Sequence, residues 1–176
     1  MARIDTRRMT HRHEGPLVVF HIGMTINRWM RPRQWWPVAA AMGPMLAELS
    51  ADPDSGLLGY RSLIGRGGPL VIQYWDSTEK LYAYASDPGA RHRPAWAAFN
   101  QRARAAEGAV GIWHETFLVE RAESIYVGTP TMGLAAATAA VPVGRRSDGA
   151  RARLAEGRTA DPRSEPADAG PVPDRR

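Results

Sequence analysis

Residues 16–26 read PLVVFHIGMTI, an almost unbroken apolar run between Gly15 and Asn27. A run of this length is typical of a central β-strand that is covered on both sides. Side chains alternate along a strand, so Phe20 and Ile22 would share one face and His21 would lie on the other. The run therefore predicts the central strand of a sheet.

The segments that follow this strand alternate between helical and extended patterns. Apolar residues at helical spacing predict a helix over Gln34–Ser50, and a Gly-rich turn separates two further apolar runs. The predicted elements are a helix over Gln34–Ser50, strands over Leu57–Gly65 and Pro69–Trp75, a helix in two pieces over 76–85 and 92–106, and a strand over Ala109–Glu120. This order is the ferredoxin-like split βαβ arrangement, an α+β fold with an antiparallel sheet.

One face of such a sheet has no helices. That face stays partly apolar and needs a cover, which a second copy of the chain can provide by packing sheet against sheet. We therefore expect a homodimer of the dimeric α+β barrel type.

The ends of the chain differ from its middle. Residues 1–14 hold four Arg against two acids, and residues 144–176 hold eight Arg against six acids, so most of the net charge of +5 lies there. Both ends are poor in bulky apolar residues, which predicts disorder. We expect a disordered basic N-terminus over 1–14, a folded domain over 15–143 and a disordered Arg/Pro/Gly-rich tail over 144–176. The tail mixes acids with its Arg, so no specific nucleic-acid partner is expected.

Several classes of protein are excluded by what the sequence lacks. The 176 residues contain no Cys, which excludes disulfides and thiolate chemistry. The longest uncharged run, Ser124–Gly144, contains Pro130 and Pro142 and is not a membrane helix, and no secretory signal is visible. His11 and His13 lie in the basic N-terminus, where we expect them to be solvated, so no metal site is expected. The sequence thus predicts a cytoplasmic protein without a membrane partner.

Two histidines lie inside predicted strands. His21 and His114 are on the first and fourth strands, which are neighbours in the ferredoxin-like order, so their imidazoles could point into one cavity. His114 could act as a general base or as an axial haem ligand. A hydrogen-bonded core or interface role is the alternative for each.

Further candidates lie at strand ends and on a helix. Asn27 and Arg28 directly follow the first strand, where Arg can hold a developing oxyanion. Tyr74 and Trp75 end the third strand on opposite faces, so one should face the helices. His92, Trp96 and Asn100 share one helical face. With Trp113, these aromatic side chains could line a pocket for a flat apolar ligand, the alternative being core or interface packing.

The sequence resembles a known family through several strings taken together. These are GMTINRW, VIQYWDS, HRPAWAAFN, VGIWHETFLV and IYVGTPTMGL, and they span about Pro16–Ala140. They resemble the monooxygenase-like family named after a fumagillin-pathway enzyme, within the dimeric α+β barrel group of antibiotic-biosynthesis monooxygenases. The family-like positions are Asn27, Arg28, Tyr74, Trp75, His92, Trp96, His114, Glu115 and Tyr126.

The resemblance implies a ferredoxin-like protomer, a homodimer and a monooxygenase-type activity. Quinone-forming members of the wider group use no metal or organic cofactor, because their polyphenolic substrates supply electrons to oxygen. Other relatives of the barrel bind haem.

Three functional hypotheses follow. The first is a small monooxygenase acting on an aromatic or polyketide-like molecule between sheet and helices, without a cofactor. In it His114 would be the base, His21 or His92 would assist, and Arg28 and Asn27 would stabilise an oxyanion. The second is a haem enzyme, a monooxygenase or an aldoxime-dehydratase-like protein, with His114, His92 or His21 as the axial ligand. The third is a non-enzymatic dimer that binds a ligand or serves as a scaffold.

Overall fold

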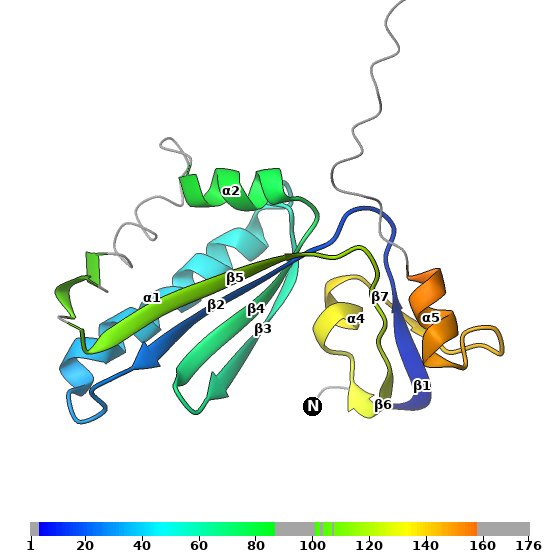
Figure 1. Cartoon of the computed structure of the whole chain (residues 1–176), viewed down its shortest axis with the longest axis horizontal. Helices are drawn as coiled ribbons and strands as arrows, with labels where there is room; N and C mark the ends of the chain where they lie inside the picture. Colours follow the sequence, from blue (N-terminus) through cyan, green and yellow to red (C-terminus); the bar gives the residue numbers. More distant parts are fainter. Residues whose placement is uncertain (1–3, 87–100, 103, 107, 158–176) are drawn as a thin grey trace, which may run out of the picture.

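The computed structural model describes residues 4–86, 101–102, 104–106 and 108–157, and it contains two antiparallel sheets (Figure 1). The larger sheet has the strand order β3-β4-β2-β5. Its strands are β2 (Val18–Ile26), β3 (Leu57–Gly65), β4 (Gly68–Trp75) and β5 (Val110–Leu118). The smaller sheet has the order β6-β1-β7, with β1 at Ile4–Arg12, β6 at Tyr126–Pro130 and β7 at Ala139–Pro142.

The larger sheet confirms the predicted ferredoxin-like arrangement. Along the chain, β2 is followed by α1 (Pro32–Ala51), β3, β4, α2 (Thr78–Ser86) and β5. The first strand, β2, lies in the middle of the sheet and pairs with β4 on one side and β5 on the other. Of the predicted helix over 92–106, residues 92–100 lie outside the described residues. The fold is α+β with antiparallel sheets, as the sequence indicated.

The core lies between one face of this sheet and the helices. On β2 this face carries Val18, Met24 and Ile26, which are all buried. Val38 and Leu49 of α1 are also fully buried, and Figure 1 shows α1 and α2 on the same side of the sheet. We call this the helix face, and the other side of the sheet the open face. The alternation predicted for β2 thus decides which residues enter the core.

Strand β1 overturns the prediction of disorder over residues 1–14. It pairs with β6 on one side and β7 on the other, although it is rich in Arg and Thr. Thr10 is buried and its hydroxyl donates to the carbonyl oxygen of Ser124 at 2.8 Å, while His11 Nδ1 lies 2.8 Å from Ser124 Oγ. Backbone pairing on both edges stabilises a strand that has few apolar side chains. His11 is therefore part of the packed structure rather than solvated.

The described part of the C-terminal tail also contains structure. Helix α5 covers Ala150–Glu156, within the range predicted to be disordered, whereas residues 158–176 lie outside the described residues. Arg153 is buried and its guanidinium Nε donates to Glu123 at 2.7 Å. The same side chain donates to the carbonyl oxygens of Ser147 and Asp148. An ion pair and hydrogen bonds of Arg153 therefore connect α5 to the fold.

The short helix α4 (Gly133–Ala137) packs on β3 and connects the two sheets. A Cβ atom added at Gly59 of β3 would lie 2.9 Å from the Cα and Cβ of Ala137, so this approach requires glycine. No helix in the described part of the chain has the length and apolar character needed to cross a membrane.

Candidate functional site

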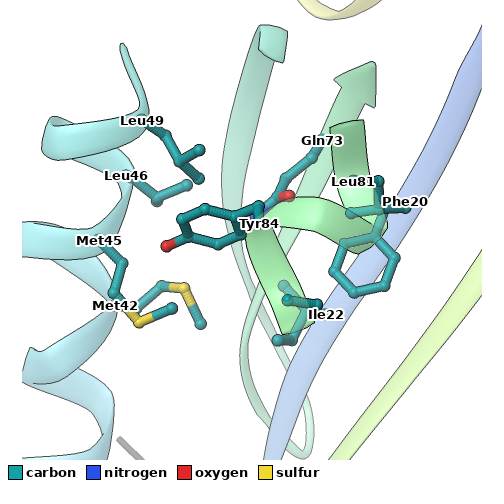
Figure 2. Close-up of a pocket in the computed structure, with 10 residues that line it drawn as sticks. Phe20, Ile22, Met42, Met45, Leu46, Leu49, Gln73, Leu81 and Tyr84 are labelled. Carbon is teal, nitrogen blue, oxygen red and sulfur yellow. The ribbon is translucent and has the colours of Figure 1, made fainter. Parts of the chain in front are cut away.

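A small apolar cavity lies between the helix face of the sheet and helices α1 and α2 (Figure 2). Its volume is about 50 Å³. Strands β2 and β4, helix α1 and helix α2 each contribute side chains to it. The lining residues are Phe20, Ile22, Met42, Met45, Leu46, Leu49, Gln73, Leu81, Tyr84 and Ala85. The cavity lies where the sequence analysis expected a substrate site, between the sheet and the helices.

Two polar side chains enter this apolar lining. Gln73 is buried, and its Oε1 accepts a hydrogen bond from the indole Nε1 of Trp75 at 2.9 Å. Because an indole N–H can only donate, this bond fixes which arm of the Gln73 amide is the oxygen. Figure 2 shows the ring of Tyr84 lying between α1 and the strands, with its hydroxyl directed towards α1. The cavity therefore has an apolar wall with two oriented polar groups, the usual composition of a small-molecule site.

Tyr84 is a permanent hydrogen-bond donor at physiological pH. Burial, and to a smaller extent the negative charge of Glu48, raises the pKa of its phenol from 10.0 to about 12. A phenol with this pKa cannot act as a base near neutral pH. It can stabilise negative charge that develops on a bound oxygen atom, which is the role the sequence analysis gave to Arg28 and Asn27.

His114 is on the helix face next to this cavity. It lies opposite Ile22 in the pairing of β2 with β5, and its ring centroid is 5.6 Å from that of Phe20. Phe20 and Ile22 both line the cavity, whereas His114 itself is exposed on the edge strand. An imidazole separated from an apolar cavity by one aromatic ring can reach a ligand that extends past that ring.

His21 does not share this position, so the prediction that both imidazoles point into one cavity is wrong. His21 lies opposite Glu115 in the same pairing, one residue away from the pair of Ile22 with His114. Residues directly opposite each other point to the same face, and successive residues point to opposite faces. His21 is therefore on the open face, where its Nδ1 lies 3.7 Å from Glu115 Oε2 and its ring lies 5.2 Å from that of Phe117.

Two further candidates share the open face with His21. The Trp113 indole lies directly against Gly23, where an added Cβ would be only 2.5 Å from the indole. Tyr74 pairs with Val19 at the other end of this face, and a Cβ at Gly133 would have the hydroxyls of Tyr126 and Tyr74 at 3.3 and 3.6 Å. Burial, with the nearby Tyr126 as the next cause, raises the pKa of Tyr74 above 10.0. The sequence predicts that either Tyr74 or Trp75 faces the helices, and in the structure it is Trp75, which packs with Leu49 and Leu81.

Asn27 and Arg28 lie at the end of the sheet and are not among the residues that line the cavity. Both backbone amides donate to the carbonyl oxygen of Ala109, and the Asn27 side chain donates to that of Gly108 at 3.1 Å. These bonds connect the end of β2 to the start of β5. Asn27 therefore has a structural role, and the Arg28 side chain is exposed.

The remaining candidates, His92, Trp96 and Asn100, lie outside the described residues. Of the five Trp residues that the structure describes, none lines the cavity, although Trp75 contacts it through Gln73 and Tyr84. Sequence reasoning missed Gln73, Tyr84 and the two methionines Met42 and Met45. Gln73 did carry a signal, since it is the one polar residue in PLVIQYW and lies two positions before Trp75, on the same face of the strand.

The described residues do not fit a haem group. A haem iron needs an axial side chain that projects into the haem cavity. His114 does not line the apolar cavity, and His21 is on the opposite face of the sheet. Within the described ranges, no three His, Asp or Glu side chains are grouped so that they could bind a metal ion.

The antiparallel sheet and its apolar site under the helices are those of a ferredoxin-like α+β protein. Comparison with known proteins gives its family. The family described as "Monooxygenase af470-like" matches residues 17–134, so the chain belongs to that family. This confirms the resemblance seen in the sequence. No curated protein matches the chain.

Several solved structures are similar in fold. SnoaB, a cofactor-independent oxygenase from Streptomyces nogalater, is 16% identical over 60% of this chain and 94% of its own, with a TM-score of 0.40. Rv0793 from Mycobacterium tuberculosis is 19% identical over 60% of this chain and 95% of its own, with a TM-score of 0.38. A dimeric ferredoxin-like protein of unknown function from Jannaschia sp. CCS1 is 15% identical over 56% and 97%, with a TM-score of 0.37.

Proposed function

We propose that this protein is a monooxygenase-type enzyme that oxidises an electron-rich aromatic or polyketide-like molecule on the helix face of its sheet. Membership of the monooxygenase af470-like family supports this proposal. The observation that carries it is the apolar cavity with the oriented groups Gln73 and Tyr84, next to which His114 lies beyond Phe20. An apolar wall, an acid–base group and a fixed donor are the elements that such a reaction needs.

The cavity holds only part of such a substrate. Its volume of about 50 Å³ accommodates a small group, and the adjacent Met42 and Met45 have flexible side chains that can change rotamer to admit a larger one. The rest of the molecule would lie over Phe20 towards His114. A flat ring in this position would place its acidic C–H or O–H group near the imidazole.

The proposed reaction converts a ring CH₂ group, which a phenol has in its keto form, and O₂ into a carbonyl group and water. His114 removes a proton from carbon, and the resulting carbanion, whose charge is delocalised onto the conjugated carbonyl oxygen of the ring system, gives its electrons to O₂. The peroxide anion that forms takes the proton back from His114. His114 then removes the second C–H proton as the O–O bond breaks, which leaves C=O, and it gives that proton to the released hydroxide to form water. The substrate supplies all the electrons, and we therefore propose no metal or organic cofactor.

Tyr84 and Gln73 have the supporting role in this proposal. The Tyr84 phenol keeps its proton at neutral pH and would donate to the ring oxygen on which negative charge develops. The Gln73 side chain is held by Trp75 and would orient the substrate. Positioned polar groups in an apolar wall stabilise charge more strongly than groups in water do.

We also propose that the protein acts in the cytoplasm as a homodimer that buries the open face. Trp113 is 37% exposed and Phe117 46% exposed on this face. Large aromatic side chains that are exposed together in this way usually mark an interface. The His21–Glu115 pair lies between them in the pairing of β2 with β5 and would be covered with them.

The test is oxygen uptake by the purified protein with a panel of anthrones, dihydroxynaphthalenes and related phenols. The expected result is one carbonyl product per O₂ consumed, and a His114→Ala variant whose turnover falls strongly and is partly restored by added imidazole. A His11→Ala variant is the matched control, because His11 lies on the smaller sheet. Full activity in the His114→Ala variant would exclude the assigned role. Binding of these compounds without any oxygen uptake would favour a ligand-binding protein over an enzyme.

A further inference from the structure

One end of the larger sheet is strongly basic and aromatic. Three connections meet there: the β2–α1 connection, the turn between β3 and β4, and the residues that precede β5 (Figure 1). Backbone bonds join them, since the amide of Ile26 donates to Gly67 at 2.7 Å and that of Asn27 to Ala109 at 2.9 Å. We call this the Arg/Trp end.

The charge at the Arg/Trp end has one sign among the described residues. Six exposed arginines lie there, namely Arg28, Arg31, Arg33, Arg66, Arg102 and Arg104. The described residues of 23–37, 62–70 and 101–113 include no Asp or Glu, and the sequence adds only Glu107, which is outside the described residues. None of the six arginines forms an ion pair with another described residue. This surface therefore favours an anionic partner.

Large apolar side chains project from the same end. Met30 is 93% exposed and Ile64 is 89% exposed, and Trp36 and Trp29 are 63% and 51% exposed. Trp35 holds the two exposed indoles, because its ring contacts both edge to face with centroids 5.8 Å away, and its Nε1 donates to the carbonyl oxygen of Trp29 at 3.1 Å. The two exposed indoles are thus fixed in place, and they lie near the exposed arginines in the chain.

We propose that the Arg/Trp end binds the surface of a bilayer that contains anionic lipids. Arginines would contact the headgroups, the indoles would lie at the interface, and Met30 and Ile64 would enter the acyl region. A nucleic acid would satisfy the arginines but would leave Met30 and Ile64 in water. A second copy of the chain in a symmetric contact through this end would bring the two sets of arginines together, which is unfavourable.

This binding would be peripheral, and it is independent of the proposed reaction. It departs from the sequence-based expectation of no membrane partner, which rested on the lack of an apolar spanning segment. A membrane surface is also where a poorly soluble aromatic substrate accumulates, so binding there would bring the enzyme to its substrate.

The test is co-sedimentation of the full chain with vesicles of phosphatidylcholine alone and of an equal mixture with phosphatidylglycerol. We expect binding to the mixture only, weakened by salt. The triple variant Arg28→Gln/Arg31→Gln/Arg33→Gln should bind about 100-fold more weakly, from about a factor of five for each arginine. The control Arg145→Gln/Arg146→Gln/Arg151→Gln removes the same charge from exposed positions elsewhere and should bind as the parent does.

A second pair of substitutions distinguishes a bilayer from other anionic partners. Met30→Ser with Ile64→Ser should weaken vesicle binding without changing the net charge, and binding should shift Trp emission to shorter wavelengths. Equal loss of binding in both triple variants would overturn the proposal, because the effect would then be of net charge alone. Binding to duplex DNA or RNA that depends on the three arginines but not on Met30 and Ile64, without vesicle binding, would assign the end to nucleic acid instead. A change of oligomeric state in the Arg28/Arg31/Arg33 variant, without vesicle binding by the parent, would assign it to self-association.

Discussion

His21 and His114 lie on opposite faces of the larger sheet, although they are on neighbouring strands and only one residue apart in register. His21 lies opposite Glu115, whereas His114 lies opposite Ile22. This offset of one residue separates an imidazole near the helix-face cavity from an imidazole on the open face. The two histidines should therefore respond differently to the same substitution.

We predict that His21→Ala leaves turnover nearly unchanged, whereas His114→Ala lowers kcat by about 10²–10⁴-fold, the usual contribution of a general base. The reason is that only His114 shares a face with the cavity. Steady-state oxygen uptake with an accepted phenol measures both effects. An equal loss in the two variants would show that the reaction takes place at a site reached from both faces, such as a dimer interface, and would contradict the assigned site.

The Tyr84 phenol gives a prediction for stability at high pH. Its pKa is raised from 10.0 to about 12 in the folded protein. Between these two values the unfolded chain loses the proton and the folded chain keeps it, so the free energy of unfolding should fall as pH rises. Below pH 10.0 both states keep the proton and Tyr84 should have no effect on this pH dependence.

We expect Tyr84→Phe to remove about 1 kcal/mol per pH unit from this decline above pH 10.0. Urea unfolding followed by circular dichroism at a series of pH values measures the slope. Identical slopes in the Tyr84→Phe variant and the parent would mean that the phenol is not buried as described.

The open face gives a prediction for the oligomeric state. Phe117 and Leu154 are similarly exposed, at 46% and 41%, but only Phe117 lies on the open face of the larger sheet. Phe117→Arg should therefore convert the proposed dimer into a monomer, whereas Leu154→Arg on α5 should not, because burying an unpaired charge in an interface is costly. Sedimentation velocity distinguishes these outcomes. A parent protein that sediments as a monomer, or dissociation by both variants, would count against the open face as the interface.

The sequence predicts the larger sheet correctly because each of its strands has a recognisable apolar pattern of its own. The run over 16–26 and the alternating helical and extended segments after it place β2, β3, β4 and β5 within a few residues of their observed bounds. Strand β1 has no such signal. Its segment, IDTRRMTHR, is mostly polar, and the hydrogen-bond partner of Thr10 is Ser124, which is far away in the sequence. Pairing with distant strands overrides a weak local propensity.

The site was harder to predict than the fold because it depends on register. Whether His114 lies opposite His21 or opposite Ile22 is decided by a shift of one residue, and the sequence of two strands does not specify that shift. The cavity also depends on Met42, Gln73 and Tyr84, which come from three different elements and carry no shared motif. Composition alone therefore directed attention to Trp and His, while the cavity is formed mainly by Met, Leu and Tyr.

Gly59 provides the sharpest test of how α4 packs against the larger sheet. A Cβ at this position would lie 2.9 Å from the Cα and Cβ of Ala137, and backbone atoms cannot move aside cheaply. Gly59→Ala should therefore lower the free energy of unfolding by about 1–3 kcal/mol, as overpacking does. It should also reduce the hydrogen-exchange protection of the Thr138 amide, which donates to Leu134 at the end of α4.

Gly43 in α1 is the matched control for this substitution. Apart from its chain neighbours, a Cβ there meets nothing within 4 Å. The higher helix propensity of Ala is opposed by the clash of its Cβ with the ring of Pro44, which follows directly, so Gly43→Ala should change the free energy of unfolding by less than about 1 kcal/mol. The same chemical change is thus expected to destabilise the protein at Gly59 and to have a small effect at Gly43, which denaturant unfolding can measure directly. A neutral Gly59→Ala variant with normal exchange at Thr138 would show that α4 does not contact β3 at this point.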